Sequence, residues 1–284
     1  MIPNIKKLLT GAAVVLLLLI ESTSAFSQGG ALMVNPKRII FEGPKRNDVV
    51  TLYNDGNDTT SYAISFKHYE MQQNGEFKDI DSIKTTELFC DSMVRYFPRE
   101  VTLSPHTAQT VRMQLLKPKD MAPGEYRSHL YFRGIERAKA IEAPKNDTNK
   151  AITLQLKAVF GLAVPIIVRI GTTPAQVTLS NMMLTPPDSG KGALLTFDIN
   201  RSGNESSYGE FIAIYSDAAN TKGVEIGSVK GVGVYVPLPM RRFQMHVKLP
   251  AVTSLSTGKV HLEYLTMTGG AKETVLTSAD MPMK

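Results

Sequence analysis

Histidine is the residue type in this chain whose side chain is best suited to bind a metal ion. The five histidines are scattered, at His68, His106, His129, His246 and His261. No two of them form the H-E-x-x-H pair that places two imidazoles on one face of a helix, and no cysteine pair is available to complete a zinc site. We therefore expect no metal centre.

The motifs of nucleotide-binding and hydrolytic enzymes are also missing. The stretch "DSGKGAL" (residues 188–194) has a Gly-Lys pair but lacks the first glycine of a phosphate-binding loop, and a glycine follows the lysine where Ser or Thr is needed. No G-x-S-x-G nucleophile motif occurs. Asp79 and Asp81 lie in a turn-like segment and are typical of solvated carboxylates rather than a catalytic pair. The sequence predicts no catalytic residue, no cofactor and no small-molecule substrate, so we expect a protein that is not an enzyme.

Cys90 is the single cysteine and cannot form an internal disulfide. It is interpreted as a buried cysteine without a chemical role. The alternative is a thiol that is reactive or that pairs with another thiol. The net charge of +6 is spread along the chain rather than clustered, which does not favour a nucleic-acid partner.

Residues 1–25 predict a secretory signal peptide. Lys6 and Lys7 precede the apolar run 8–20, and Thr23-Ser24-Ala25 supplies small residues for cleavage before Phe26. The apolar run is too short for a comfortable membrane span. We expect a mature protein outside the cytoplasm.

Apolar residues alternate with polar ones through most of the chain, which is the period of β-strands. The first half has seven candidate strands between turn residues, at 31–41, 48–54, 61–70, 93–97, 110–116, 125–132 and 152–168. This pattern is typical of an immunoglobulin-like sandwich, and Tyr126 would start the sixth strand, where such sandwiches tie a corner through a tyrosine hydroxyl. The polar segment 134–150 is expected to be a long loop, which we predict to be ordered only with a bound partner.

A second, smaller sandwich is expected from residue 171 onward. Its candidate strands are 175–184, 193–200, 209–216, 241–249, 259–267 and 272–277. The Gly-rich stretch 227–239 is interpreted as a loose hairpin or an irregular edge. The predicted fold is all-β, with two immunoglobulin-like sandwiches in tandem, at residues 26–170 and 171–284.

The stretch "ITLQLKAVFGLAVPIIV" (residues 152–168) is apolar at every even-numbered position. At about 3.3 Å per residue it would span about 56 Å, well beyond a usual strand. One half could therefore pair within its own sandwich while the other half serves a partner. Any core strand alternates in this way, so the pattern alone fits a buried strand equally well. Pro165, which has no N–H, belongs on an edge or at a bulge.

Two stretches resemble periplasmic chaperones of the chaperone–usher pathway, which escort pilus subunits. They are "NPKRIIFEGPKRNDVVTLYNDGN" (35–57) and "RYFPREVTLSPHTAQTVRMQLLKPKDMAPGEYRSHLYF" (95–132). With the ribbon at 152–168, the resemblance covers most of residues 31–170. It implies a periplasmic protein with two immunoglobulin-like domains that binds pilus subunits and passes them to an outer-membrane usher.

The resemblance also implies a binding surface for the subunit. In such chaperones the seventh strand lends alternate apolar side chains to a subunit that lacks one strand. In this sequence those side chains would be Ile152, Leu154, Leu156, Ala158, Phe160 and Leu162.

The same family clamps the terminal carboxylate of the subunit between an arginine and a lysine. Arg38 in "KRIIFEG" matches the arginine, whereas Pro165 stands where the lysine would be. Lys157 or Arg169 could substitute for the lysine, or the cargo could be held differently. For Arg38 itself the alternative is an ordinary solvated strand arginine.

Two other functions remain open from the sequence. The chain could be a structural or adhesive surface protein whose edge strand pairs into a polymer or with a second copy. A carbohydrate-binding sandwich is disfavoured because Trp is absent and the tyrosines are not clustered.

Overall fold

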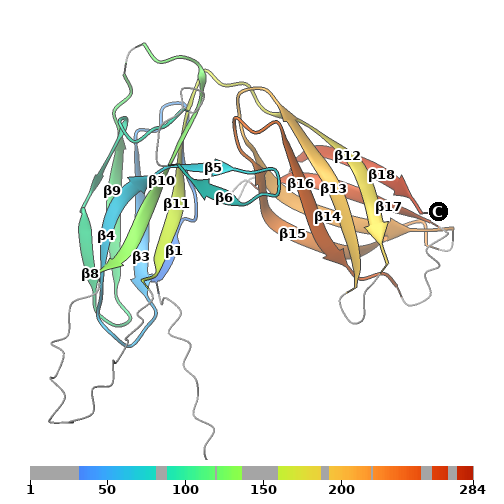
Figure 1. The fold of residues 1–284 in the computed structure, drawn as a ribbon, viewed down its shortest axis with the longest axis horizontal. Coiled ribbons are helices and arrows are strands. Elements are labelled where there is room, and N and C mark those ends of the chain that lie inside the picture. The colour runs from blue at the N-terminus through green and yellow to red at the C-terminus, as the bar shows by residue number, and fades with distance from the viewer. Residues whose placement is uncertain are drawn as a thin grey trace, which may run out of the picture. The chain divides into compact units, whose positions relative to one another are not determined.

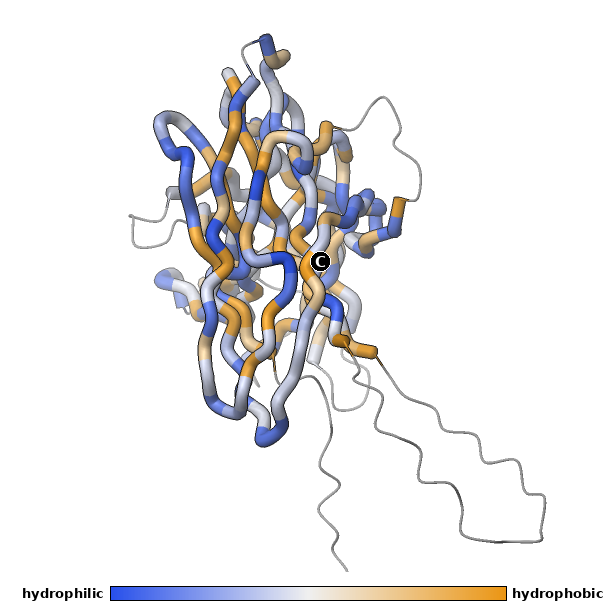
Figure 2. Tube along the Cα trace, turned by 90° about the vertical axis from the view of Figure 1, so that its left-hand side faces the viewer, coloured by the Kyte–Doolittle hydropathy of each residue, from blue (hydrophilic) through white to orange (hydrophobic). Residues whose placement is uncertain are grey.

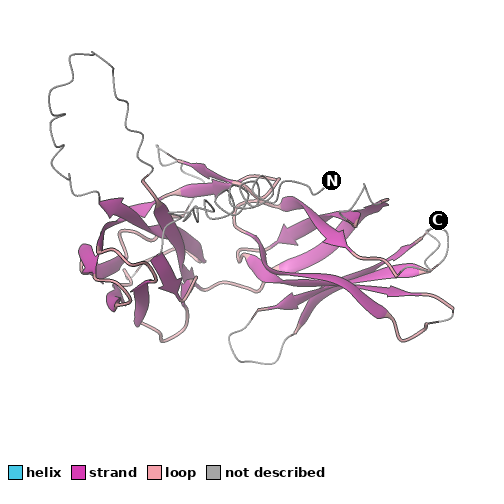
Figure 3. Cartoon of the chain, turned by 90° about the horizontal axis from the view of Figure 1, so that it is seen from below, coloured by secondary structure: helices cyan, strands magenta, loops and turns pink. Residues whose placement is uncertain are grey.

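A computed structural model describes residues 32–80, 88–118, 120–135, 159–186, 192–218, 220–250, 258–267 and 274–283. These residues form β-strands joined by loops and turns, without an α-helix among them (Figure 3). Hydrophobic and hydrophilic residues alternate along the strands, as Figure 2 shows. The fold is all-β with two immunoglobulin-like sandwiches in tandem, as predicted (Figure 1).

The first sandwich consists of two sheets, in the orders β1-β3-β9-β7 and β2-β11-β10-β4-β8. Its strands are β1 (Leu32–Asn35), β2 (Ile39–Phe41), β3 (Asn47–Asn54), β4 (Thr60–Lys67), β7 (Val94–Phe97), β8 (Glu100–Leu103), β9 (Ala108–Leu115), β10 (Gly124–Ile135) and β11 (Gly161–Ile170). Side chains from both sheets form one core, to which Phe41, Leu52, Leu130, Phe132 and Ile166 contribute fully buried side chains. Cys90 also belongs to this core.

One predicted strand is divided in two. Residues 31–41 were expected to form a single strand, but β1 pairs with β3 in one sheet, whereas β2 pairs in parallel with β11 in the other. Pro36 lies between them; it has no N–H to donate and its φ is fixed, so a continuous ladder cannot run through it. Because of this break, Arg38 lies directly before β2.

The predicted tyrosine corner is confirmed. The hydroxyl of Tyr126 donates a hydrogen bond to the carbonyl oxygen of Ala122 at 2.9 Å, four residues upstream. Tyr126 is itself buried in the first core, so the bond fixes the entry of β10 into its sheet.

The second sandwich has sheets in the orders β12-β13-β16 and β15-β14-β17-β18. Its strands are β12 (Gln176–Thr185), β13 (Ala193–Ser202), β14 (Ser207–Ser216), β15 (Val224–Val234), β16 (Met240–Val247), β17 (Lys259–Thr266) and β18 (Val275–Pro282). The rings of Phe211 and Tyr264 are stacked at its centre, with centroids 4.2 Å apart. The Gly-rich stretch, interpreted as a loose hairpin or an irregular edge, lies mostly in β15, which is an edge strand with two register shifts against β14 and so matches the irregular edge.

A short hairpin between the sandwiches was not predicted. It consists of β5 (Tyr69–Met71) and β6 (Phe77–Asp79) (Figure 1). Met71 of β5 is buried in an apolar cluster with Ile167 of the first sandwich and Tyr235 of the second. The backbone N–H of Arg242 in β16 donates to the carbonyl of Gln73 at 2.8 Å, so the hairpin contacts both sandwiches.

Candidate functional site

The edge of β11 is the first feature that could bind another chain. Strand β10 pairs with β11 along its whole length, from Gly161 to Ile170, whereas β2 pairs only with 166–168. Within the described residues, no strand pairs with the other side of Gly161–Pro165. Backbone N–H and C=O groups on such an edge are available to a further strand.

Pro165 lies at the point where the edge opens. It faces His129 of β10 in a continuous register, one residue before pairing with β2 begins at Ile166. A proline has no N–H to donate to a neighbouring ladder, so its presence helps to limit β2 to the C-terminal part of β11. The sequence had placed this proline on an edge or at a bulge, and the structure shows the edge.

The even-numbered side chains of β11 leave the core toward its N-terminal end. Val164 and Ile166 are buried in the first core, and Leu162 is partly buried against it. Just before the strand, Val159 and Phe160 are 54% and 51% exposed. An exposed phenylalanine thus directly precedes an unpaired strand edge. The predicted partner-binding residues Ile152, Leu154, Leu156 and Ala158 lie outside the described residues, as do Lys157 and most of the predicted loop.

Arg38 is the second predicted site residue, and its guanidinium lies among tyrosine rings of the second sandwich. Its Cζ is 4.2 Å from the ring centroid of Tyr208 and 5.5 Å from that of Tyr235. Its Nε and Nη1 atoms are buried and have no hydrogen-bond partner among the described residues. A buried donor without a hydrogen-bond partner destabilises the protein. Donation of hydrogen bonds from this guanidinium to an anion would therefore be favourable.

A cavity of about 760 Å³ adjoins Arg38. This volume falls in the range of pockets that hold ligands. Four cationic side chains line it, those of Lys37, Arg38, Arg169 and Lys230, together with the carboxylates of Glu205 and Glu210. Two of these cations are paired with carboxylates, Arg169 with Glu205 and Lys230 with Glu210.

Arg169 is not a free cation of this cavity. Its Nε donates to Glu125 at 3.1 Å, and its Nη1 lies 3.4 Å from Glu42 and 3.5 Å from Glu205. Three carboxylates therefore share this guanidinium. Of the two substitutes considered for the missing lysine, Arg169 is already neutralised and Lys157 lies outside the described residues.

Glu125 connects the two sandwiches at this point. Its side chain is completely buried, and it accepts hydrogen bonds from the backbone N–H of Ser206, at 3.1 Å, and from the Ser206 hydroxyl. With Arg169 as a third donor, its charge is compensated entirely by protein groups. Sequence reasoning missed this residue because its partners come from distant parts of the chain.

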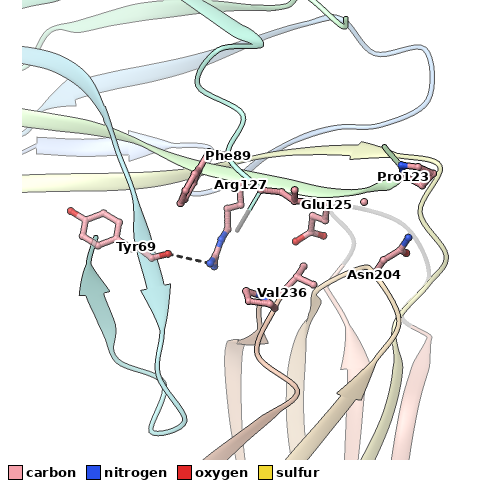
Figure 4. A pocket seen from close by; sticks show the side chains of 10 residues that line it. Tyr69, Phe89, Pro123, Glu125, Arg127, Asn204 and Val236 are labelled. Atoms are coloured by element: carbon pink, nitrogen blue, oxygen red, sulfur yellow. Dashed lines mark hydrogen bonds between the residues drawn. The ribbon is translucent and has the colours of Figure 1, made fainter. Parts of the chain in front are cut away.

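A second cavity lies beside Glu125, and Figure 4 shows the residues around it. The guanidinium of Arg127 donates to the carbonyl of Tyr69 at 3.3 Å along one wall, opposite Val236 and Asn204 of the second sandwich. Its volume is about 110 Å³. This is well below the range of about 300–1,000 Å³ found for ligand pockets, so the cavity beside Arg38 is the better candidate site.

His129 is a buried histidine of β10. Burial, with Arg127 and His68 nearby, lowers the pKa of His129 to about 3, so this imidazole stays neutral. Within the described residues, no three His, Cys, Asp or Glu side chains are grouped closely enough to hold a metal ion.

The described part of the chain has no helix that is long and apolar enough to cross a membrane.

Cys90 is expected to be inert toward thiol reagents in the folded protein. Burial raises the pKa of its thiol to about 12, and the thiol donates to the carbonyl of Ile166 at 3.2 Å. At pH 8 almost no reactive thiolate is present and the sulfur is not accessible. We expect a disulfide reagent to label the urea-unfolded chain completely before it labels the native protein measurably. Equal rates in the two states would contradict this.

Comparison with known proteins gives matches among solved structures only. No protein-family model matches the sequence, and no curated protein matches it. The Class 5 fimbriae chaperone CfaA is 13% identical, with 89% of this chain and 99% of that chain covered and a TM-score of 0.42. The E. coli chaperone DraB is 11% identical, with 90% and 97% covered and a TM-score of 0.43.

A third similar structure is the Salmonella enterica SafA pilin in complex with the SafB chaperone. It is 11% identical, with 89% of this chain and 96% of that chain covered and a TM-score of 0.43. At these identities and TM-scores the similarity assigns no role to any residue of this chain. The solved structures to which the chain is similar include fimbrial chaperones, the class of protein that its sequence resembles.

Proposed function

We propose that this protein is a periplasmic chaperone that binds pilus or fimbrial subunits by lending them an edge strand. The observation that carries the proposal is the open edge of β11 at Gly161–Pro165, directly after the exposed side chain of Phe160. A subunit that lacks one strand exposes an apolar groove and unpaired backbone groups, and it aggregates unless both are covered. An extended strand of another chain covers both at once.

The apolar ribbon would supply the side chains for this groove. Ile152, Leu154, Leu156, Ala158, Phe160 and Leu162 are the proposed contacts. Burial of one large apolar side chain contributes roughly 1.5–3 kcal/mol, so several in a row would hold a subunit tightly. Leu162 would mark the boundary, because it already packs partly against the first core.

Arg38 would provide the second contact, with the terminal carboxylate of the subunit. The support for this role is the adjoining cavity and two guanidinium nitrogens that have no hydrogen-bond partner in the part of the chain that the structure describes. Both nitrogens are buried, so the guanidinium would turn toward the cavity to form a bidentate pair with the carboxylate.

The chaperone would act without a catalytic residue, a cofactor or a metal ion. Its signal peptide would bring it to the periplasm, and an outer-membrane usher would receive the subunit. Release would then require another strand to replace residues 152–162 in the groove of the subunit, which is an exchange of non-covalent contacts.

Co-expression tests the proposed function directly. The tagged chain is produced in the periplasm together with each secreted protein encoded beside it, purified by the tag and analysed by mass spectrometry and light scattering. We expect a one-to-one complex with a subunit that is insoluble when it is produced alone. If every neighbouring protein is soluble alone and none is retained, the proposal is wrong.

The same open edge also fits a structural or adhesive surface protein, which would pair its edge with another copy. That protein would form polymers as its concentration rises and would appear on the cell surface. Light scattering of the purified chain over a hundredfold concentration range separates the two functions, because a chaperone would not extend into polymers.

We expect Arg38→Ala to weaken subunit capture about ten- to hundredfold with little loss of stability. A charge-assisted hydrogen bond to a carboxylate contributes about 1.5–3 kcal/mol. The substitution also removes two buried guanidinium nitrogens, Nε and Nη1, that have no partner among the described residues, which offsets the lost stacking on Tyr208. Titration of the captured subunit gives the affinity and thermal unfolding gives the stability. Arg38→Lys keeps the charge without the planar fork and should fall between the two. Unchanged affinity in Arg38→Ala would exclude this contact.

A further inference from the structure

The β5–β6 hairpin depends on its surroundings for stability. Within the described residues its strands, 69–71 and 77–79, form a separate two-stranded sheet. A hairpin of this kind is marginally stable by itself in water. Its turn is closed by the N–H of Gly75, which donates to the carbonyl of Gln72 at 2.8 Å. The remaining stability has to come from contacts with the two sandwiches.

The first sandwich holds the base of the hairpin. Arg127 of β10 donates to the carbonyl of Tyr69 at 3.3 Å, which is the dashed line in Figure 4. The ring of Tyr69 lies edge-on to that of His129, with centroids 4.9 Å apart. On the neighbouring strand β4, the Nζ of Lys67 is 2.6 Å from the carboxylate of Asp79. Contacts from two strands of the first sandwich therefore fix the direction in which the hairpin leaves it.

Met71 of β5 lies at the centre of the apolar contact between the sandwiches. Its side chain is 5% exposed and packs in one cluster with Ile167 of β11 and Tyr235 of the second sandwich. Successive side chains of a strand point to opposite faces, so Ile167 points away from the first core that contains its neighbours Ile166 and Val168. One apolar side chain from each sandwich thus depends on the hairpin for its cover.

The tip of the hairpin contacts an edge strand of the second sandwich. Strand β16 is the outer strand of the sheet β12-β13-β16, and the N–H of Arg242 in β16 donates to the carbonyl of Gln73 at 2.8 Å. A Cβ atom on Gly75 would collide with the guanidinium of Arg241, so this guanidinium passes directly over the hairpin backbone. Arg241 is held there because its Nη1 donates to the carbonyl of Gly233 at 2.7 Å.

The other contact described between the sandwiches, at Glu125, lies beside their covalent connection. That connection is formed by residues 171–175, between β11 and β12, and Glu125 faces Arg169 in the strand register. A contact beside a pivot restricts rotation less than a contact farther from it. Figure 1 shows the hairpin crossing toward β16 apart from this connection. Relative motion is the ordinary expectation for two domains unless their interface is large and apolar.

We propose that the β5–β6 hairpin is a brace that fixes the orientation of the second sandwich relative to the first. The first sandwich holds its base, β16 holds its tip, and Met71 fills the apolar space between them. Without the brace, the two sandwiches reorient about residues 171–175 on the microsecond-to-millisecond timescale of hinge motions.

Replacement of residues 72–76 by Asn-Gly removes the tip and keeps the strands of the hairpin. A two-residue Asn-Gly turn connects paired antiparallel strands with the correct twist, so Met71 and Phe77 remain opposite each other. Residual dipolar couplings of the backbone amides in the purified protein report the orientation of each sandwich. We expect one alignment tensor to describe both sandwiches of the wild type, and two different tensors to be required for the shortened variant.

Met71→Lys tests the middle of the brace. It places an ammonium group in an apolar cluster whose Tyr235 ring already lies 5.5 Å from the Cζ of Arg38 and 4.4 Å from that of Arg127. Burial of a further cation there is unfavourable, so the hairpin should detach and two tensors should again be required. Met33→Lys is the matched control, because it makes the same change at a side chain of β1 that is 57% exposed. It should keep the single tensor.

Hydrogen exchange of the amides in β10 and β14 checks that both sandwiches are folded in every variant. A single tensor with the wild-type orientation in either hairpin variant overturns the proposal, and so does a need for two tensors in the wild type. Two tensors in Met33→Lys would also overturn it, because the loss of orientation would not be specific to the hairpin. All of these measurements use the protein without a partner, so their outcome is independent of the proposed function.

Discussion

Replacement of Leu156 and Phe160 by aspartate is expected to abolish subunit capture. In the proposed complex both side chains enter the apolar groove of the subunit, where each contributes roughly 1.5–3 kcal/mol by burial. Two carboxylates in the same groove would lose that contribution and would also be desolvated without partners. Co-purification of subunit with the tagged variant measures the effect.

The opposite face of the same ribbon provides the matched control. Gln155→Asp with Val159→Asp adds the same two charges at odd-numbered positions, and Val159 is 54% exposed in the free protein. We expect this variant to capture the subunit nearly as well as the wild type. Both double variants should retain the thermal unfolding of the parent, because Phe160 is also half exposed. Capture by the Leu156/Phe160 variant at wild-type strength, or equal loss in both variants, would remove the strand-lending model.

Glu125→Ala is expected to lower the free energy of unfolding by about 3–5 kcal/mol. Removal of one partner of a buried ion pair leaves the other charge uncompensated. Here the substitution leaves the guanidinium of Arg169, only 14% exposed, without its nearest carboxylate. It also deprives Ser206 of the acceptor for its N–H and its hydroxyl. Urea unfolding followed by far-UV circular dichroism gives the change.

Glu42 offers a comparison on the same guanidinium. Its carboxylate lies 3.4 Å from Arg169 but is 57% exposed. Exposed ion pairs contribute about 0–1 kcal/mol, so Glu42→Ala should have a small effect. Glu125→Gln keeps an acceptor and should be less harmful than Glu125→Ala. Equal destabilisation by Glu42→Ala and Glu125→Ala would show that burial of the pair does not determine its contribution.

The fold class and the face of most strands could be predicted from the amino-acid sequence alone. Alternation of apolar and polar residues predicts which side chains point to a core, because successive side chains of a strand point to opposite faces. Thus Met245 and Val247, two residues apart in the candidate strand 241–249, are both buried in the second core. Tyr126 was likewise assigned to a corner from its position after Pro123-Gly124, and its hydrogen bond to Ala122 is present.

The neighbours of each strand could not be predicted in this way, because they depend on the tertiary structure. The alternating pattern is the same whether β11 is flanked on one side or on both, and the open edge exists because β2 pairs with only 166–168. The ion pair of Glu125 with Arg169, the ring of Tyr208 beside Arg38 and the pairing of Lys230 with Glu210 all join distant strands. The local pattern of apolar and polar residues predicts which face of a strand a side chain occupies and whether it is buried. The residue that it contacts across a sheet or in the other sandwich depends on how distant parts of the chain pack together.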